Sequence, residues 1–219
     1  MKKIVIYGTA SLADIAADLV GKAGWQTAGY VVSDEYFSRE NDYGGKNVIP
    51  FSQMAEVYPP EEYDAVIGMM VSDLQVTRED IYRKVKALGY SFPNLIHPSA
   101  VVETETIGEG NIILSCVSID RRCKIGDMNL IWQNVVLPHD NELGSFCNLA
   151  PSVSFSGGSR VLNHCFLGNN SALNNFVTVH DFGFVGAGAF VSSDLPEYGV
   201  VVPARSVLLE NKKSTEMGF

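Results

Sequence analysis

Residues 113–131 read ILSCVSIDRRCKIGDMNLI, and an isoleucine recurs at every sixth position of this stretch. The same register continues in both directions, and sixteen successive positions hold large apolar residues: Val101, Ile107, Ile113, Ile119, Ile125, Ile131, Leu137, Leu143, Leu149, Phe155, Val161, Leu167, Leu173, Val179, Val185 and Val191. Neither an α-helix nor a flat strand has a period of six. The pattern therefore predicts a repeat architecture.

The positions two residues before these apolar ones, from Asn111 to Ala189, hold only small or medium-sized residues, which indicates a crowded corner. A chain that turns every six residues closes a triangle every eighteen, and stacked triangles form parallel ladders about 4.8 Å apart. The eighteen-residue spacing also relates glycines within two series: Gly108, Gly126 and Gly144, and Gly168 and Gly186. They are predicted to stack at corners where φ is positive or backbones approach closely. The sequence therefore predicts about five coils.

The first 95 residues have a different pattern, in which short apolar runs alternate with segments of helical spacing. The expected strands are 3–7, 27–32 and 65–68, and the expected helices are 12–20 and 77–88. Alternating strands and helices favour a small parallel sheet. We therefore expect a Rossmann-like α/β domain over residues 1–95, followed by a β-helix domain with a C-terminal tail over residues 96–219.

Composition excludes several classes of function. Hydrophobic residues make up 46% of the chain, enough for a real core, and the net charge of −9 without a Lys/Arg cluster argues against nucleic-acid binding. The apolar runs are too short for membrane insertion or a signal peptide, so a cytoplasmic protein is expected. Cys116, Cys123, Cys147 and Cys165 lack metal-ligand spacing, so no metal site is expected.

The segments Ile125-Gly126 and Val185-Gly186-Ala187-Gly188-Ala189 fit a repeat of the form (L/I/V)-G-x-x-(S/T/A/V)-x. This repeat resembles that of the hexapeptide acyltransferases, which form left-handed β-helices and trimers. The two-part layout is similar to the bacterial sugar acyltransferases of the PglD and NeuD type. The resemblance implies a left-handed helix, a homotrimer, acetyl-CoA or another acyl-CoA as co-substrate, and a nucleotide-linked sugar as acceptor in surface-glycan biosynthesis.

Among the four histidines, His139 is the expected general base. Acyl transfer from a thioester needs a group that accepts a proton near neutral pH, and histidine suits this role. His139 and Asp140 match the His-Asp/Glu-x-x-(I/L)-Gly step where the family carries its base, and the carboxylate would orient the imidazole. The alternative is a solvated turn histidine. His97, His164 and His180 are expected to be structural, although His180 lies beside another carboxylate.

Two glycines, Gly157 and Gly158, follow His139 and Asp140 by eighteen residues, one coil further along. Their missing side chains are expected to leave room for a pantetheine arm or an acceptor. We therefore assign both glycines to the acyl-CoA site.

Asn148 lies nine residues after His139, where relatives commonly carry a second histidine that reaches the acyl carbonyl oxygen. An asparagine can still donate an N–H to an oxyanion. The alternative is an asparagine in a turn ladder.

The acyl-CoA site is expected to include Gly186 and Ala187 as well.

The loop after the first strand reads Gly8-Thr9-Ala10-Ser11-Leu12-Ala13, whereas relatives carry G-x-x-G-x-(G/A). Small residues at a helix N-terminus can bind a diphosphate. Asp34, at the end of the second strand, is expected at a ribose or base, and Gly68 is expected to form a third wall. The alternative is a tight turn that binds no ligand.

Three hypotheses follow. The first is an N-acyltransferase in which the sugar amine attacks the thioester directly, because no side chain has the surroundings of a covalent nucleophile. The second is an O-acyltransferase acting on sialic acid or another glycan unit. The third is a non-catalytic β-helix that binds sugars or serves as a scaffold, which the altered glycine loop and Asn148 favour.

Overall fold

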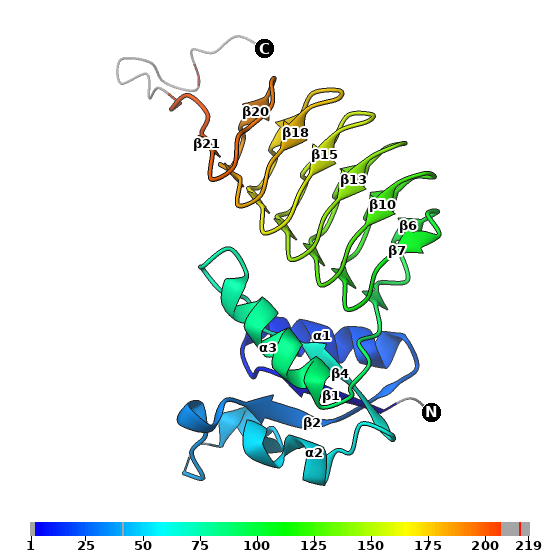
Figure 1. Ribbon diagram of the computed structural model, residues 1–219, viewed down its shortest axis with the longest axis vertical. Coiled ribbons are helices and arrows are strands. Elements are labelled where there is room, and N and C mark those ends of the chain that lie inside the picture. The colour runs from blue at the N-terminus through cyan, green and yellow to red at the C-terminus, as the bar shows by residue number, and fades with distance from the viewer. Residues whose placement is uncertain (1–2, 41, 207–214, 216–219) are drawn as a thin grey trace.

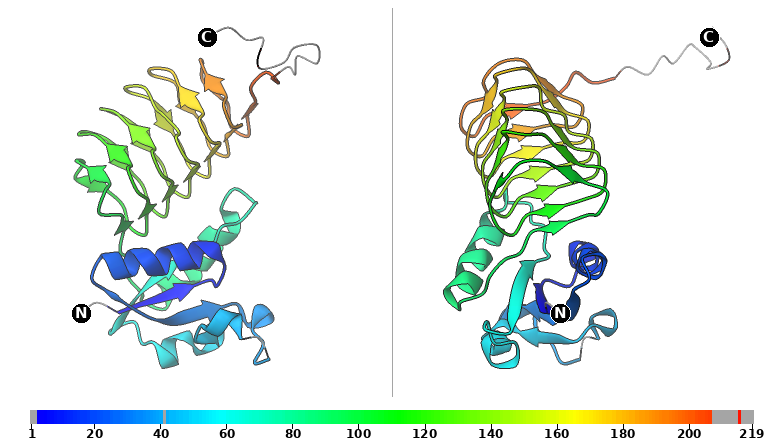
Figure 2. Two further views of the ribbon diagram at one scale, coloured as in Figure 1. Left: turned by 180° about the vertical axis from the view of Figure 1, so that it is seen from behind. Right: turned by 90° about the vertical axis from the view of Figure 1, so that its right-hand side faces the viewer.

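The computed structural model describes residues 3–40, 42–206 and 215. A small α/β sheet with its helices is followed by a stack of short parallel strands, and α1 and α3 lie between the sheet and the stack (Figures 1 and 2). The fold is the expected α/β subdomain followed by a left-handed parallel β-helix.

The N-terminal sheet has four parallel strands in the order β3-β2-β1-β4. Its elements are β1 Lys3–Tyr7, α1 Ser11–Lys22, β2 Gln26–Val32, β3 Val48–Pro50, α2 Met54–Val57, β4 Tyr63–Ile67 and α3 Val76–Ala87, with 3₁₀ turns at Asp34–Tyr36, Tyr43–Gly45 and Phe51–Gln53. All expected strands and helices are present within two residues of their predicted bounds. The sequence did not predict β3 or α2.

The β-helix has three faces, each built from two-residue strands. The first face contains β5 Leu95–Ile96, β8 Ile112–Ile113, β11 Leu130–Ile131, β14 Asn148–Leu149, β16 Phe166–Leu167, β19 Phe184–Val185 and β21 Val200–Val201. The second face contains β6 Val101–Val102, β9 Ser118–Ile119, β12 Val136–Leu137, β17 Ala172–Leu173 and β20 Phe190–Val191, with Ser154 bridging its middle. The third face contains β7 Thr106–Ile107, β10 Lys124–Ile125, β13 Glu142–Leu143, β15 Arg160–Val161 and β18 Thr178–Val179.

The six-residue period reflects a core of inward side chains and a repeated corner. From Ile113 to Val191 the predicted apolar positions are buried in one continuous cluster. At the corners, Asn111 Oδ1 accepts the backbone N–H of Asn129, whose own Oδ1 accepts the N–H of Cys147, so buried amides tie successive coils together. These bonds satisfy backbone groups that the turns would leave unpaired.

The stacked glycines allow the backbones of successive coils to approach closely, and their φ values are not positive. A Cβ atom at Gly126 would lie 2.7 Å from the carbonyl carbon of Gly144 in the next coil. The left-handed backbone conformation instead falls two residues later, at Met128 and every sixth residue in this region, and is adopted mostly by residues other than glycine. Only the close-approach part of the expectation is therefore confirmed.

The first coil corrects one predicted position. Val102, not Val101, pairs with Ile119 and packs against the core, because this coil is one residue shorter than the eighteen-residue period. The side chain of Val101 is 56% exposed.

The α/β part packs directly on the β-helix. Residues of α1 form one cluster with Leu95, Ile112 and Leu130 of the first face. Arg78 of α3 is fully buried and donates to the carbonyl oxygens of Met128 and Ile67. Burial lowers the pKa of Arg78 to about 9. This contact holds the start of α3 beside the β-helix.

Candidate functional site

His139 and Asp140 form the corner between β12 on the second face and β13 on the third face. His139 Nδ1 lies 2.9 Å from Asp140 Oδ2, and Asp140 has the left-handed φ of 63° that recurs at these corners. The contact directs Nε2 of the imidazole away from the carboxylate. The His139 side chain is 60% exposed, so Nε2 is accessible to a substrate.

Arg122, one coil earlier, fixes the carboxylate of Asp140. Its Nε donates to Asp140 Oδ1 at 2.6 Å, and its Nη2 donates to Oδ2 at 2.8 Å. These bonds from Arg122, together with that from His139, hold the pKa of Asp140 well below its usual range. Arg122 was not predicted, although its spacing of eighteen residues from Asp140 places it directly in the neighbouring coil.

The space expected beside Gly157 and Gly158 is filled by side chains of this chain. A Cβ atom at Gly157 would lie 2.8 Å from Cε1 and 3.1 Å from Nε2 of His139. A Cβ atom at Gly158 would lie 2.6 Å from the ring of Phe176, and its φ is 71°. Gly157 therefore makes room for the imidazole, which corrects the expectation of an empty channel there.

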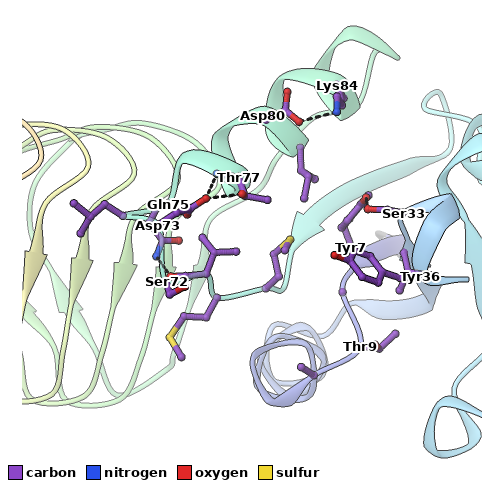
Figure 3. Close-up of a pocket in the computed structure, with 18 of the residues that line it drawn as sticks. Tyr7, Thr9, Ser33, Tyr36, Ser72, Asp73, Gln75, Thr77, Asp80 and Lys84 are labelled. Atoms are coloured by element: carbon purple, nitrogen blue, oxygen red, sulfur yellow. Dashed lines mark hydrogen bonds and ion pairs between the residues drawn. The ribbon is translucent and has the colours of Figure 1, made fainter.

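A cleft of about 1660 Å³ lies between the α/β part and the first face of the β-helix. Its lining comes from the ends of β1 and β2, the loop 69–75, the start of α3, and Asn148, Cys165, Phe166 and Phe184 of the β-helix (Figure 3). Clefts at the carboxyl ends of parallel strands are the usual ligand sites of such sheets. The cleft is large enough for a nucleotide-linked sugar.

One side of the cleft is the expected diphosphate loop, since Gly8, Thr9 and Ala10 all line it. Ala10 is the N-cap of α1 and provides no side-chain cap, so the helix N-terminus keeps N–H groups for an anion. Gly8 has a φ of 117° and packs on Gly68. Gly68 itself does not line the cleft, because it is buried where a Cβ atom would meet Ile6, which corrects its expected role as a wall.

Asp34 also lines the cleft, as expected for a ribose or base contact. Its Oδ1 accepts bonds from the hydroxyl of Ser52 at 2.5 Å and from the backbone N–H of Ser52 at 3.3 Å. Beside it, the Tyr7 hydroxyl lies 2.8 Å from Ser33 Oγ, and burial raises the pKa of Tyr7. The carboxylate is thus held at the rim, with its second oxygen available to a ligand.

Asn148 lies on the first face and is 5% exposed, in the lining of the cleft. Its Oδ1 accepts the indole N–H of Trp132 at 2.9 Å, which leaves the amide nitrogen as a donor. Within one chain, the structure does not bring Asn148 together with His139, which lies at the corner between the second and third faces. Gly186 and Ala187 follow β19, at the corner between the first and second faces, and are likewise apart from His139.

The other histidines have structural partners or surface positions. His164 is 8% exposed, with Nδ1 at 3.0 Å from the carbonyl oxygen of Leu74 and Nε2 at 3.0 Å from a carboxylate oxygen of Glu79. His97 Nδ1 bonds within its own turn, and His180 is exposed. His164 therefore ties α3 and the loop before it to the β-helix.

Neither a membrane-spanning helix nor a metal-binding cluster of side chains occurs in the part of the chain that the structure describes. Among residues 3–40, 42–206 and 215, no helix combines the length and apolar character needed to cross a membrane. The same residues contain no group of three or more His, Cys, Asp or Glu side chains placed to bind a metal ion.

The chain is similar over nearly its whole length to solved sugar acetyltransferases. A histidine-to-alanine variant of GDP-perosamine N-acetyltransferase from Caulobacter crescentus, solved with CoA and GDP-perosamine, is 27% identical, with a TM-score of 0.81 over 93% of this chain and 94% of that chain. The acetyltransferase domain of PglB from Neisseria gonorrhoeae, solved with acetyl coenzyme A, shares the fold at 24% identity, with a TM-score of 0.79 over 92% of this chain and 96% of that chain. The expected resemblance to hexapeptide-repeat sugar acyltransferases is confirmed.

Sequence comparisons give a shorter match. Acyl-[acyl-carrier-protein]–UDP-N-acetylglucosamine O-acyltransferase from Pseudomonas putida is 28% identical in an alignment of length 124 that covers 49% of this chain and 46% of the relative. The chain thus spans about half the length of the curated relatives it matches. No family model matches the chain.

Proposed function

We propose that this chain, a hexapeptide-repeat protein of the sugar acyltransferase type, transfers an acetyl or similar acyl group from acyl-CoA to the amino group of a nucleotide-linked sugar. The main support is its likeness over 93% of its length to an N-acetyltransferase solved with CoA and a nucleotide-linked sugar. A cleft with an uncapped helix N-terminus and an accessible imidazole–carboxylate pair fits this chemistry. Both substrates are cytoplasmic metabolites, so the reaction is proposed to occur in the cytoplasm, in surface-glycan biosynthesis.

In the proposed mechanism, the sugar amine attacks the thioester carbonyl carbon and His139 Nε2 takes the proton that the nitrogen loses. Asp140, fixed by Arg122, holds the imidazole through Nδ1 and stabilises its protonated form. The carbon–sulfur bond then breaks, and the CoA thiolate takes up the proton. The proposed oxyanion donor is the amide nitrogen of Asn148 or a backbone N–H.

Acyl-CoA contacts are proposed at Gly186 and Ala187. Gly157 is proposed to act through His139, because the imidazole occupies the space above its Cα atom. The diphosphate is proposed to bind at Gly8, Thr9 and Ala10.

We predict a homotrimer, because the cleft and His139 lie on different sides of one prism and a neighbouring chain can bring them together. Exposed apolar side chains on the β-helix outside the cleft support such packing: Val136, Phe176, Phe190 and Val200. Light scattering should give about three times the 23.8 kDa chain mass. A monomer at all concentrations would contradict a site shared between chains.

The function is tested by measuring CoA thiol release from acetyl-CoA across a panel of UDP-, GDP- and dTDP-linked amino sugars. We expect at least one sugar to give stoichiometric thiol release and an amide product that resists hydroxylamine. Matched sugars with a hydroxyl in place of the amine should be inactive. Binding of the panel without thiol release from any member would favour the non-catalytic scaffold.

O-acylation is the second candidate, since the Pseudomonas putida relative is an O-acyltransferase. The same panel separates the two reactions, because an O-acyl product is an ester that hydroxylamine cleaves. Thiol release with the hydroxyl sugars and a cleavable product would replace the N-acyl proposal.

A further inference from the structure

Gln75, immediately before α3, has an unpaired polar atom in the wall of the cleft. The residue is 2% exposed and lines the cleft, and its Oε1 has no hydrogen-bond partner among the residues that the structure describes. Its Nε2 lies 3.5 Å from the carbonyl oxygen of Val71. A buried carbonyl oxygen without a donor is unfavourable, and such groups in native proteins usually have a partner. A ligand in the cleft can provide that partner.

The backbone around Gln75 is held in an unusual conformation. Leu74 and Gln75 have φ values of 52° and 69°, the left-handed region that residues other than glycine adopt at a cost. Asp73 Oδ2 caps α3 by accepting the N–H of Thr77, and His164 Nδ1 donates to the carbonyl oxygen of Leu74. Anchors on both sides of Gln75 therefore hold the backbone from which its side chain extends.

Gln75 lies at the end of the cleft beside the β-helix. Figure 3 shows Gln75 next to the β-helix coils, with Tyr7 and Thr9 on the opposite side. The stacked rings of Phe166 and Phe184, 5.0 Å apart, line the cleft at the β-helix end and offer an apolar surface. If the diphosphate binds at the N-terminus of α1, the rest of the ligand lies in a cleft that Gln75 also lines.

We propose that Gln75 is a specificity-determining residue whose Oε1 accepts a hydrogen bond from a hydroxyl or amino group of the sugar. This inference rests on the proposed function, because that function places a nucleotide-linked sugar in the cleft. A sugar without a donor at this position leaves the oxygen buried and unpaired, which is an effective way to reject an analogue.

The test compares Gln75→Leu, which removes the acceptor, with Gln75→Glu, which keeps an acceptor oxygen. Calorimetry measures the dissociation constants of the panel sugar that the wild type binds best and of its nucleoside diphosphate alone. Gln75→Leu should weaken binding of the nucleotide sugar roughly tenfold or more and change binding of the nucleoside diphosphate less than about twofold. Gln75→Glu should bind the nucleotide sugar within about threefold of the wild type.

Gln53→Leu is the matched control, because Gln53 is exposed on a 3₁₀ turn outside the cleft, and it should bind both ligands like the wild type. Unchanged nucleotide-sugar binding by Gln75→Leu overturns the inference, and so does equal weakening for the nucleoside diphosphate. A wild type that binds no nucleotide sugar more tightly than its nucleoside diphosphate also overturns it. Because binding is measured without acyl transfer, absent thiol release counts against the proposed function alone.

Discussion

Gly157→Ala is expected to lower kcat by roughly ten- to a hundredfold in a protein that remains folded. The new methyl group would lie 2.8 Å from Cε1 of the His139 imidazole, so the ring must move. The His139 side chain is 60% exposed and can turn into solvent, which spares the coil but takes the base from its position. A displacement of about 1 Å in a catalytic group can cost about a hundredfold in rate. Steady-state kinetics and a thermal melt measure the two effects.

The control is Gly21→Ala in α1, where an added Cβ atom has no neighbour within 4 Å. That variant should keep the wild-type kcat. Wild-type kcat in Gly157→Ala would show that the ring position over Gly157 is not used in catalysis. A change confined to the KM for acyl-CoA would instead favour Gly157 as a direct contact to the donor substrate.

The fold could be predicted because the hexad register repeats one physical requirement, an inward apolar side chain, at many positions. The predicted register was wrong only at Val101, because Val102 occupies the core position there. Both residues are valines, so the sequence does not indicate that this coil is shorter. The edge strand β3 was missed because Val48–Pro50 is too short to show a period. The six-residue pattern therefore predicts the regular coils, but it does not predict the shorter first coil or the short edge strand.

The residues of the candidate site also differ in whether sequence spacing could predict them. The pair of His139 and Asp140 follows from adjacent residues, and Arg122 could have been found from the eighteen-residue spacing. A spacing of nine, as for Asn148, is half a coil and therefore indicates another side of the prism. Gln75 could not be found from sequence, because its position depends on a bond between Leu74 and His164, ninety residues apart.

His139→Ala should lower kcat by roughly a hundredfold or more while the affinity for acyl-CoA changes little, since general-base assistance contributes on the order of 10² to 10⁴. Asp140→Asn should cost less, because the imidazole remains and loses only its carboxylate partner. Wild-type turnover by His139→Ala, on a substrate that the enzyme demonstrably uses, would remove His139 from the mechanism.

The pH profile of kcat/KM tests whether the loss of rate depends on the contacts of Asp140 with His139 and Arg122. The pKa of Asp140 lies well below its usual range, so Asp140 stays ionised throughout the assay range and the acidic limb belongs to another group. Asp140→Asn should move the limb to lower pH, because a base beside residue 140 then loses a negative neighbour. Arg122→Met should move it to higher pH, because the same base then loses a nearby positive charge and the Asp140 carboxylate keeps its negative charge. Shifts in the same direction for both variants, or no shift in either, would contradict a base oriented by Asp140.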